Sequence, residues 1–221
     1  MPNPSNNNPV AVAATDHGPE RPESHATASS SQLAGHEALP ELRKTLSAGL
    51  KQYPDFPKTG ILFEDIFPLF ATPSLHRALI DAFILTATNN LPASTTPDFV
   101  VGLDARGFLI GPQLALHFNA GFVPVRKPGK LPGKLETAEY VKEYGKDVFA
   151  IQKEAIPAGS KVLVVDDLIA TGGSAGAAAE LIRKVGGELL GFIFLIELTK
   201  LEGRKKLGNA PVWTVLESQA A

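Results

Sequence analysis

The chain has 221 residues, of which 44% are hydrophobic, and this is enough for a single domain with a sizeable core. Its formal net charge of −2 at pH 7 indicates no basic surface for nucleic acid, and no apolar run approaches the roughly 18 residues of a membrane span. There is no cysteine, which excludes disulfide bonds, thiolate metal sites and a cysteine nucleophile.

Residues 1–36 are rich in Pro, Asn, Ser, Ala and Thr. Such a segment buries too little apolar surface to offset the entropy of ordering, so we predict a disordered tail; a targeting or partner-binding segment is the alternative. Its start lacks the basic-then-apolar pattern of a signal peptide, and we therefore expect a cytoplasmic protein. The folded domain is predicted over residues 37–221.

Helical and strand patterns alternate along the rest of the chain. The predicted elements, in chain order, are helices at 39–52 and 72–89, a strand at 98–103, a helix at 107–118, strands at 122–126, 147–151 and 162–165, a helix at 173–185, a strand at 189–197, a short helix at 200–207 and a strand at 212–216. Residues 53–57 form a rigid connection and residues 127–146 a long loop. The alternation predicts an α/β fold with a mainly parallel sheet that is flanked by helices on both faces.

The most informative stretch is residues 162–174. An aliphatic run ends in two adjacent carboxylates, Asp166 and Asp167, and then in the turn Thr171-Gly172-Gly173-Ser174, which opens a helix. Glycines and the N–H groups of a helix start suit a phosphate, whereas ionised Asp accepts hydrogen bonds from neighbouring hydroxyls. A phosphate with vicinal hydroxyls is a ribose 5-phosphate. The alternative is a turn without a ligand; neither a Walker A loop nor a G-x-G-x-x-G fingerprint is present.

This stretch resembles the phosphoribosyl pyrophosphate motif of type I phosphoribosyltransferases. Four further segments, at 56–66, 102–108, 125–133 and 143–145, are similar to the adenine phosphoribosyltransferase family. The resemblance runs in order over residues 37–217. It implies the type I phosphoribosyltransferase fold, with a small hood subdomain formed by residues 37–70 and the segment after 197, and a long flexible lid loop.

The resemblance also implies an activity. Adenine and 5-phosphoribosyl 1-pyrophosphate would give AMP and pyrophosphate through an oxocarbenium-like transition state, as a step of purine salvage. Mg²⁺ would be the cofactor, held through substrate and water with no direct protein ligand. The enzyme would be a homodimer, with no nucleic-acid or membrane partner. Two alternatives remain, namely another base such as hypoxanthine or xanthine, and a regulator that binds the sugar pyrophosphate without catalysis.

A second motif, residues 102–107, also lies at a strand end that opens a helix. Its Arg106 is a good bidentate partner for phosphate, although pairing with Asp104 is the alternative. The resemblance makes this the pyrophosphate loop and implies a cis peptide between Asp104 and Ala105. The complete expected site for the sugar pyrophosphate is Asp104, Ala105, Arg126, Lys127, Lys130, Asp166, Asp167, Ala170, Thr171, Gly172, Gly173 and Ser174.

By resemblance, Arg126 reaches the pyrophosphate of the partner subunit, while Lys127 and Lys130 attend the pyrophosphate together with Arg106. A solvated basic loop is the alternative for these three loop cations. Glu143 and Tyr144 match the lid residues of the family, and with Arg106 they are the expected catalytic residues. Glu143 would exchange a proton with the adenine ring as N9 attacks, and Tyr144 would cover the ribose and pyrophosphate.

The expected adenine site is Ile61, Leu62, Phe63, Glu64 and Leu168. Phe63 and Leu168 match the residues that sandwich the purine, although both also suit an ordinary core. Position 64 departs from the family, because many relatives carry Arg where this chain has Glu.

Overall fold

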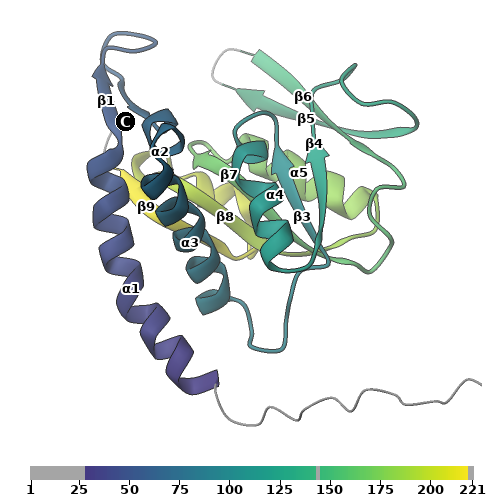
Figure 1. The fold of residues 1–221 in the computed structure, drawn as a ribbon. Coiled ribbons are helices and arrows are strands. Elements are labelled where there is room, and N and C mark those ends of the chain that lie inside the picture. The colour runs from purple at the N-terminus through teal and green to yellow at the C-terminus, as the bar shows by residue number, and fades with distance from the viewer. Residues whose placement is uncertain (1–27, 143–144, 219–221) are drawn as a thin grey trace, which may run out of the picture.

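A five-stranded parallel sheet forms the centre of the molecule, with strand order β4-β3-β7-β8-β9 (Figure 1). The structure is a computed structural model that describes residues 28–142 and 145–218. The strands are β3 (Phe99–Leu103), β4 (Gly121–Val125), β7 (Lys161–Ile169), β8 (Glu188–Leu198) and β9 (Val212–Ser218). The predicted α/β architecture with a parallel sheet is therefore confirmed.

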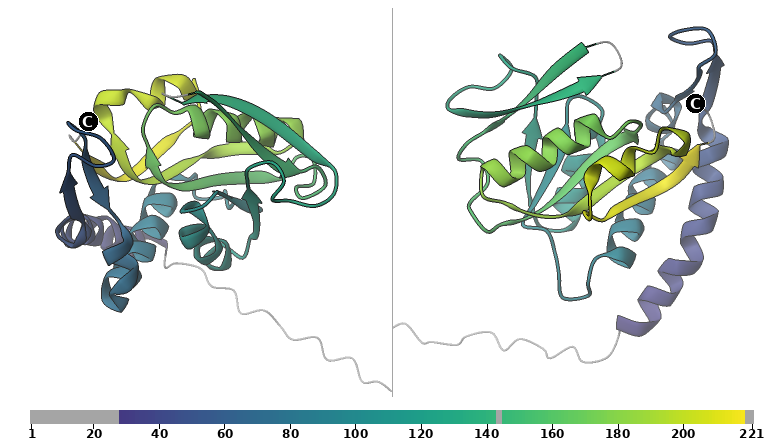
Figure 2. Two further views of the ribbon diagram at one scale, coloured as in Figure 1. Left: turned by 90° about the horizontal axis from the view of Figure 1, so that it is seen from above. Right: turned by 180° about the vertical axis from the view of Figure 1, so that it is seen from behind.

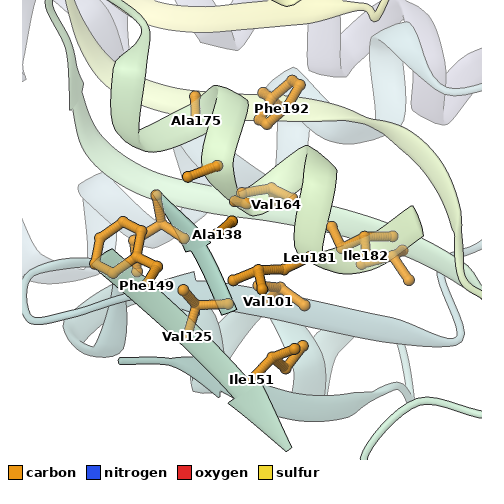
Figure 3. Close-up of a cluster of buried hydrophobic side chains, with 14 of the residues drawn as sticks. Val101, Val125, Ala138, Phe149, Ile151, Val164, Ala175, Leu181, Ile182 and Phe192 are labelled. Carbon is orange, nitrogen blue, oxygen red and sulfur yellow. The ribbon is translucent and has the colours of Figure 1, made fainter. Parts of the chain in front are cut away.

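Residues of the central strand β7 alternate between two hydrophobic clusters, as a strand that is buried on both faces requires. Val162 and Val164 face helix α5 (Gly173–Lys184) and the antiparallel strands β5 (Leu135–Lys142) and β6 (Gly145–Gln152). Figure 3 shows this cluster, in which Phe149 and Leu181 pack over the sheet.

The opposite face of the sheet is covered by helices α1 (Ala28–Gly49), α3 (Pro73–Asn90) and α4 (Gly107–His117). Leu163 and Val165 of β7 pack against them, and both views of Figure 2 show the two layers on either side of the sheet. None of the helices in the described ranges combines the length and the apolarity of a membrane span.

A small antiparallel hairpin, β1 (Lys51–Pro54) and β2 (Leu62–Asp65), projects beyond the helix layer and leads into α2 (Phe67–Ala71). The end of β9 lies beside this hairpin in all three views (Figures 1 and 2), and Arg43 of α1 donates a hydrogen bond to the Thr214 carbonyl of β9. The hood subdomain expected from residues 37–70 and the segment after 197 stays a prediction. Neither β1, β2 nor α2 was predicted.

Helix α1 differs from its prediction at both ends. It begins at Ala28 instead of residue 39 and ends at Gly49 instead of residue 52, and Pro40 lies inside it. Residues 28–36, expected to be disordered, are therefore helical. Their composition is polar, but it includes Ala, Gln and Leu, which have high helix propensity. The rest of the predicted tail lies outside the described residues.

The predicted loop at 127–146 is the largest error in the predicted elements. Strand β5 and the first residues of β6 lie within it and pair in register, with Ala138 opposite Phe149 and Tyr140 opposite Asp147. Ala138 and Tyr140 are buried while Glu139 between them is exposed, which is the alternation of a half-buried strand. Glu143 and Tyr144, between β5 and β6, lie outside the described residues.

Two smaller differences occur near the carboxyl end of the sheet. Strand β7 was predicted to end at Val165, but it continues to Ile169, so that Asp166 and Asp167 belong to the strand. The predicted short helix at 200–207 consists of two 3₁₀ helices, η1 (Thr199–Leu201) and η2 (Gly203–Leu207). The remaining predicted elements agree with the structure within one or two residues.

We predict that Leu46→Ala lowers the free energy of unfolding by about 2–5 kcal/mol, because Leu46 of α1 is completely buried in the helix-side cluster and its truncation leaves a cavity. Urea unfolding monitored by circular dichroism measures the change. Lys44→Ala, at an exposed position of the same helix, is the control and should change stability by less than about 0.5 kcal/mol. Equal effects of the two substitutions would mean that α1 is not packed on the core.

Candidate functional site

A cavity of about 280 Å³ opens at the carboxyl end of the parallel sheet, the position at which α/β proteins commonly bind ligands. Its wall is formed by the turn from β3 to α4, the turn from β7 to α5, side chains at and near the β5–β6 hairpin, and Phe194 of β8. The residues that line it are Leu103, Asp104, Ala105, Arg106, Lys127, Tyr140, Phe149, Asp166, Asp167, Leu168, Ile169, Ala170, Thr171, Gly172, Gly173, Ser174, Ala175 and Phe194.

The turn from β7 to α5 has the geometry of an anion site. Gly172, the residue before the helix, has a φ of 78°, in the left-handed region that favours glycine. No side chain caps the helix, so its first N–H groups are available to a ligand at the positive end of the helix dipole. Thr171 and Ser174 add hydroxyl groups at the same wall of the cavity.

The turn from β3 to α4 brings Arg106 to the two carboxylates. Its Nε lies 2.9 Å from Oδ2 of Asp167, rather than pairing with Asp104. This close approach depends on Gly107, because a Cβ there would lie 2.7 Å from the Val165 carbonyl oxygen and 3.2 Å from Oδ1 of Asp166. The expected cis peptide between Asp104 and Ala105 is present in this turn.

The two carboxylates are unequally neutralised. Burial, together with the charge of Asp167, raises the pKa of the Asp166 carboxyl well above its usual range. Burial also raises the pKa of Asp167, although the Arg106 guanidinium opposes that shift. The pair therefore holds protons more tightly in the folded chain than in the unfolded one.

Lys127 reaches the cavity from the segment after β4. Its Nζ lies 3.2 Å from Oδ2 of Asp147, and the same oxygen accepts a hydrogen bond of 3.2 Å from the Tyr140 hydroxyl. The Tyr140 ring packs on Phe149, with 4.8 Å between ring centroids. Sequence reasoning missed Tyr140, Phe149 and Phe194 as cavity residues; the strand alternation around residue 138 was a signal for the first two.

Other expected site residues lie away from the cavity wall. Arg126 donates from Nε to Oδ2 of Asp104 at 3.1 Å and from Nη1 to the Lys130 carbonyl at 3.3 Å, and its guanidinium lies 5.8 Å from the centre of the Phe108 ring. Lys130 is exposed. Among the described residues that line the cavity, neither Arg126 nor Lys130 is present.

The expected base site is divided. Leu168 lines the cavity, whereas Ile61, Leu62, Phe63 and Glu64 belong to or precede strand β2 and do not line it. Phe63 packs edge-on against Phe56, with 5.1 Å between ring centroids.

Glu64 accepts a hydrogen bond from Gln52 through Oε1. Its buried Oε2 has no hydrogen-bond partner among the described residues. The structure thus gathers the expected residues for the sugar pyrophosphate at one cavity, except Arg126 and Lys130. Most of the expected base residues do not line that cavity.

We predict that Asp166→Asn stabilises the ligand-free protein at neutral pH. A carboxyl with a raised folded-state pKa contributes stability that is present below its unfolded pKa of about 4 and is lost as the pH rises through the folded pKa. Asn does not titrate and avoids this loss. The variant's advantage should therefore grow with pH, by up to about 1.4 kcal/mol for each unit of pKa shift.

Urea unfolding from about pH 4 to pH 8, without substrate, measures this difference. Asp81→Asn, at an exposed carboxylate of α3, is the matched control and should show no such trend. A constant difference between Asp166→Asn and the wild type at every pH would contradict the assignment of a raised pKa.

Comparison with known proteins gives a consistent result. Residues 74–219 match the phosphoribosyl transferase domain family. The chain is 54% identical to adenine phosphoribosyltransferase of Eremothecium gossypii over 82% of this chain and 96% of that one. It is 56% identical to adenine phosphoribosyltransferase 1 of Saccharomyces cerevisiae over 79% and 92% of the two chains.

Solved structures agree with these relatives. The Saccharomyces cerevisiae adenine phosphoribosyltransferase, complexed with D-2,5-dideoxy-2,5-imino-altritol 1,6-bisphosphate and adenine, superposes with a TM-score of 0.77 at 54% identity, covering 80% of this chain and 99% of that one. The enzyme from Rhodothermus marinus gives a TM-score of 0.73 at 44% identity, covering 81% and 99%. With its type I phosphoribosyltransferase fold, the chain therefore belongs to the adenine phosphoribosyltransferase family.

Proposed function

We propose that this protein is a purine salvage enzyme that transfers the 5-phosphoribosyl group from 5-phosphoribosyl 1-pyrophosphate to adenine, giving AMP and pyrophosphate. The observation that carries the proposal is the single cavity wall on which a phosphate-type turn, a carboxylate pair and two cations, Arg106 and Lys127, meet. A phosphorylated sugar with a second anionic group fits this wall: its phosphate suits the turn, its hydroxyls suit the carboxylates, and its second anionic group suits the cations.

The sugar end of the substrate is assigned to the β7–α5 turn. The backbone N–H groups of residues 171–174 hold the 5-phosphate, with the hydroxyls of Thr171 and Ser174 as further donors. Ala170 forms the start of the same turn. Asp166 and Asp167 accept hydrogen bonds from the two ribose hydroxyls, which supplies donors to carboxylates that the fold neutralises only in part.

The pyrophosphate is assigned to the other side of the cavity. Arg106 and Lys127 are its cationic partners, and Asp104 and Ala105 form the adjoining loop. As the bond from C1′ to the pyrophosphate oxygen breaks, positive charge develops on the ribose ring and negative charge on the leaving group. The two cations, already held in position by Asp167 and Asp147, stabilise that negative charge in the oxocarbenium-like transition state.

Adenine is assigned to Leu168 and to the hood residues Ile61–Glu64. N9 of the base forms the new bond to C1′ as the ring loses its N–H proton, and Glu143 is the acid/base group that exchanges this proton with the ring. Tyr144 covers the sugar. The roles of Glu143, Tyr144 and the hood residues rest on the family resemblance. Because Glu64 stands where many relatives have Arg, we assign base recognition in the hood to backbone groups.

Mg²⁺ fits the donor set of this cavity. Carboxylate oxygens of Asp104 and Asp166 line it, and such oxygens are the ligands that Mg²⁺ prefers. As the family resemblance implies, we assign the ion to substrate oxygens and water rather than to a direct protein ligand. Bound there, Mg²⁺ would neutralise charge on the leaving pyrophosphate.

We further propose a homodimer in the cytoplasm. Arg126 and Lys130 lie outside the lining of their own cavity, which supports a role for Arg126 at the pyrophosphate of a partner subunit, as in the family. Arg126 also donates a hydrogen bond to Asp104, which lines the cavity of its own subunit. In such a dimer, Arg126 would therefore connect the two cavities. Lys130 would support the pyrophosphate from the same loop.

The first prediction of the proposal is Mg²⁺-dependent formation of AMP from radiolabelled adenine and 5-phosphoribosyl 1-pyrophosphate. Hypoxanthine and guanine, tested in parallel, should give little or no product. Turnover of an oxopurine in place of adenine would overturn the assigned base. Binding of the sugar pyrophosphate without turnover of any base would instead favour a regulator.

A second prediction concerns Glu143. Glu143→Gln should lower kcat about 10²-fold, since it removes a proton donor and acceptor, and it should leave the unfolding temperature unchanged. Glu154→Gln removes the same charge at an exposed position after the hairpin and should retain wild-type kcat. Wild-type turnover by Glu143→Gln would contradict the role of Glu143 as the general acid/base.

A further inference from the structure

The β7–α5 turn is in direct backbone contact with the segment that follows β8. A Cβ added to Gly203, the first residue of η2, would lie 2.3 Å from the Ala170 carbonyl oxygen and 2.9 Å from the Gly172 backbone nitrogen. A Cβ added to Gly172 would lie 2.3 Å from the Gly203 carbonyl oxygen. Two glycines therefore face each other with no room for a side chain on either, and the position of η2 fixes the position of the turn.

A second contact joins η2 to the helix that the turn opens. The Leu207 side chain, at the end of η2, lies 4.0 Å from where a Cβ of Gly176 would be, and it packs against the cluster that includes α5. In Figure 2 the segment between β8 and β9 runs beside the start of α5. Both sides of the turn at 170–174 are therefore supported by one short segment.

An ion pair anchors that segment to the sheet. Nε of Arg204, adjacent to Gly203, lies 2.7 Å from each carboxylate oxygen of Glu197, and Nη2 lies 2.6 Å from Oε2. Glu197 is only 5% exposed and pairs with Ile169 across β7 and β8, directly before the turn.

Arg204 also reaches the next strand. It donates hydrogen bonds to the Val212 carbonyl and, at 3.1 Å, to the Thr214 hydroxyl of β9. A planar guanidinium that meets a carboxylate and two further acceptors has a fixed direction as well as a fixed place. The contacts of Arg204 therefore determine where the backbone of Gly203 meets the turn at 170–174.

We propose that Arg204, together with Glu197 and Gly203, positions the turn at 170–174 for the sugar phosphate. Neither Arg204 nor Glu197 lines the cavity, so Arg204 is a positioning residue that acts through Gly203. The inference rests on the proposed function, in which this turn holds the 5-phosphate. A hydrophobic pair would anchor the segment as firmly, but without the directional contacts that align the N–H groups of the turn.

The test compares Arg204→Gln with Arg204→Lys by steady-state kinetics and by calorimetric binding of ribose 5-phosphate. Arg204→Gln should raise the KM for 5-phosphoribosyl 1-pyrophosphate and the Kd for ribose 5-phosphate about five- to tenfold, with the KM for adenine unchanged. Arg204→Lys keeps the positive charge but loses the planar guanidinium with its several N–H donors. Its affinity for the sugar phosphate should therefore lie between those of the wild type and Arg204→Gln. Lys205→Gln is the matched control, because it breaks the exposed Lys205–Glu202 ion pair in the segment that also holds Arg204. It should behave as wild type.

A merely structural anchor would give a different result. It would lower the unfolding temperature and reduce kcat with the folded fraction, while both the KM for the sugar pyrophosphate and the Kd for ribose 5-phosphate stay at wild-type values. That outcome overturns the proposal. Where Arg204→Gln does not fold, Arg204→Lys and Gly203→Ala carry the test, because an added Cβ at position 203 displaces the turn directly.

A third variant separates this inference from the function on which it rests. Thr171→Ala removes a hydroxyl from the turn itself and should also raise the KM for the sugar pyrophosphate. If Thr171→Ala and the variants at 203 and 204 all leave this KM unchanged, the phosphate assignment of the turn is wrong. If Thr171→Ala raises it and the variants at 203 and 204 do not, only the positioning role is overturned.

Discussion

Two adjacent carboxylates at the end of the central strand are the constraint on which the site depends. Asp166 and Asp167 both lie within strand β7, so the strand fixes the direction of their side chains. Arg106 neutralises one of them, at 2.9 Å, and burial raises the pKa of both. Because burial disfavours the charged carboxylates, this pair lowers the stability of the ligand-free fold at neutral pH. Hydroxyl groups of a bound ligand would offset that loss by donating hydrogen bonds to the carboxylates.

The cations of the site are held by carboxylates of the protein. Arg106 pairs with Asp167, Lys127 with Asp147, and Arg126 with Asp104. Each guanidinium or ammonium group is thus directed before an anionic substrate arrives, and less conformational entropy is lost when it binds. The same contacts balance the charges of a cavity that would otherwise gather like charges in a partly buried space.

The segment after β8 connects two parts of the site. Through Gly203 it touches the turn that we assign to the sugar phosphate, and through Arg204 it is fixed to β9, whose end lies beside the β1–β2 hairpin of the expected hood (Figure 1). This short stretch of chain is therefore in contact with the sheet, with the turn at 170–174 and with α5. A substitution there is expected to act on substrate affinity, although the stretch itself does not line the cavity.

The parallel α/β fold and the strand–turn–helix at 162–174 could be predicted from the amino-acid sequence, because hydrophobic periodicity and glycine-rich turns are local properties of the chain. Through family resemblance it also predicted residues that the structure places at one cavity, among them Asp104, Arg106, Lys127 and Asp166. Three features became visible only in the folded chain: Arg106 pairs with Asp167, a hairpin places Tyr140 at the cavity, and Gly203 contacts Gly172. The contacts of Arg106 with Asp167 and of Gly203 with Gly172 join segments far apart in the chain, so no local pattern predicts them. The hairpin has a local signal in its alternation, but its place beside the cavity depends on how it packs on the sheet.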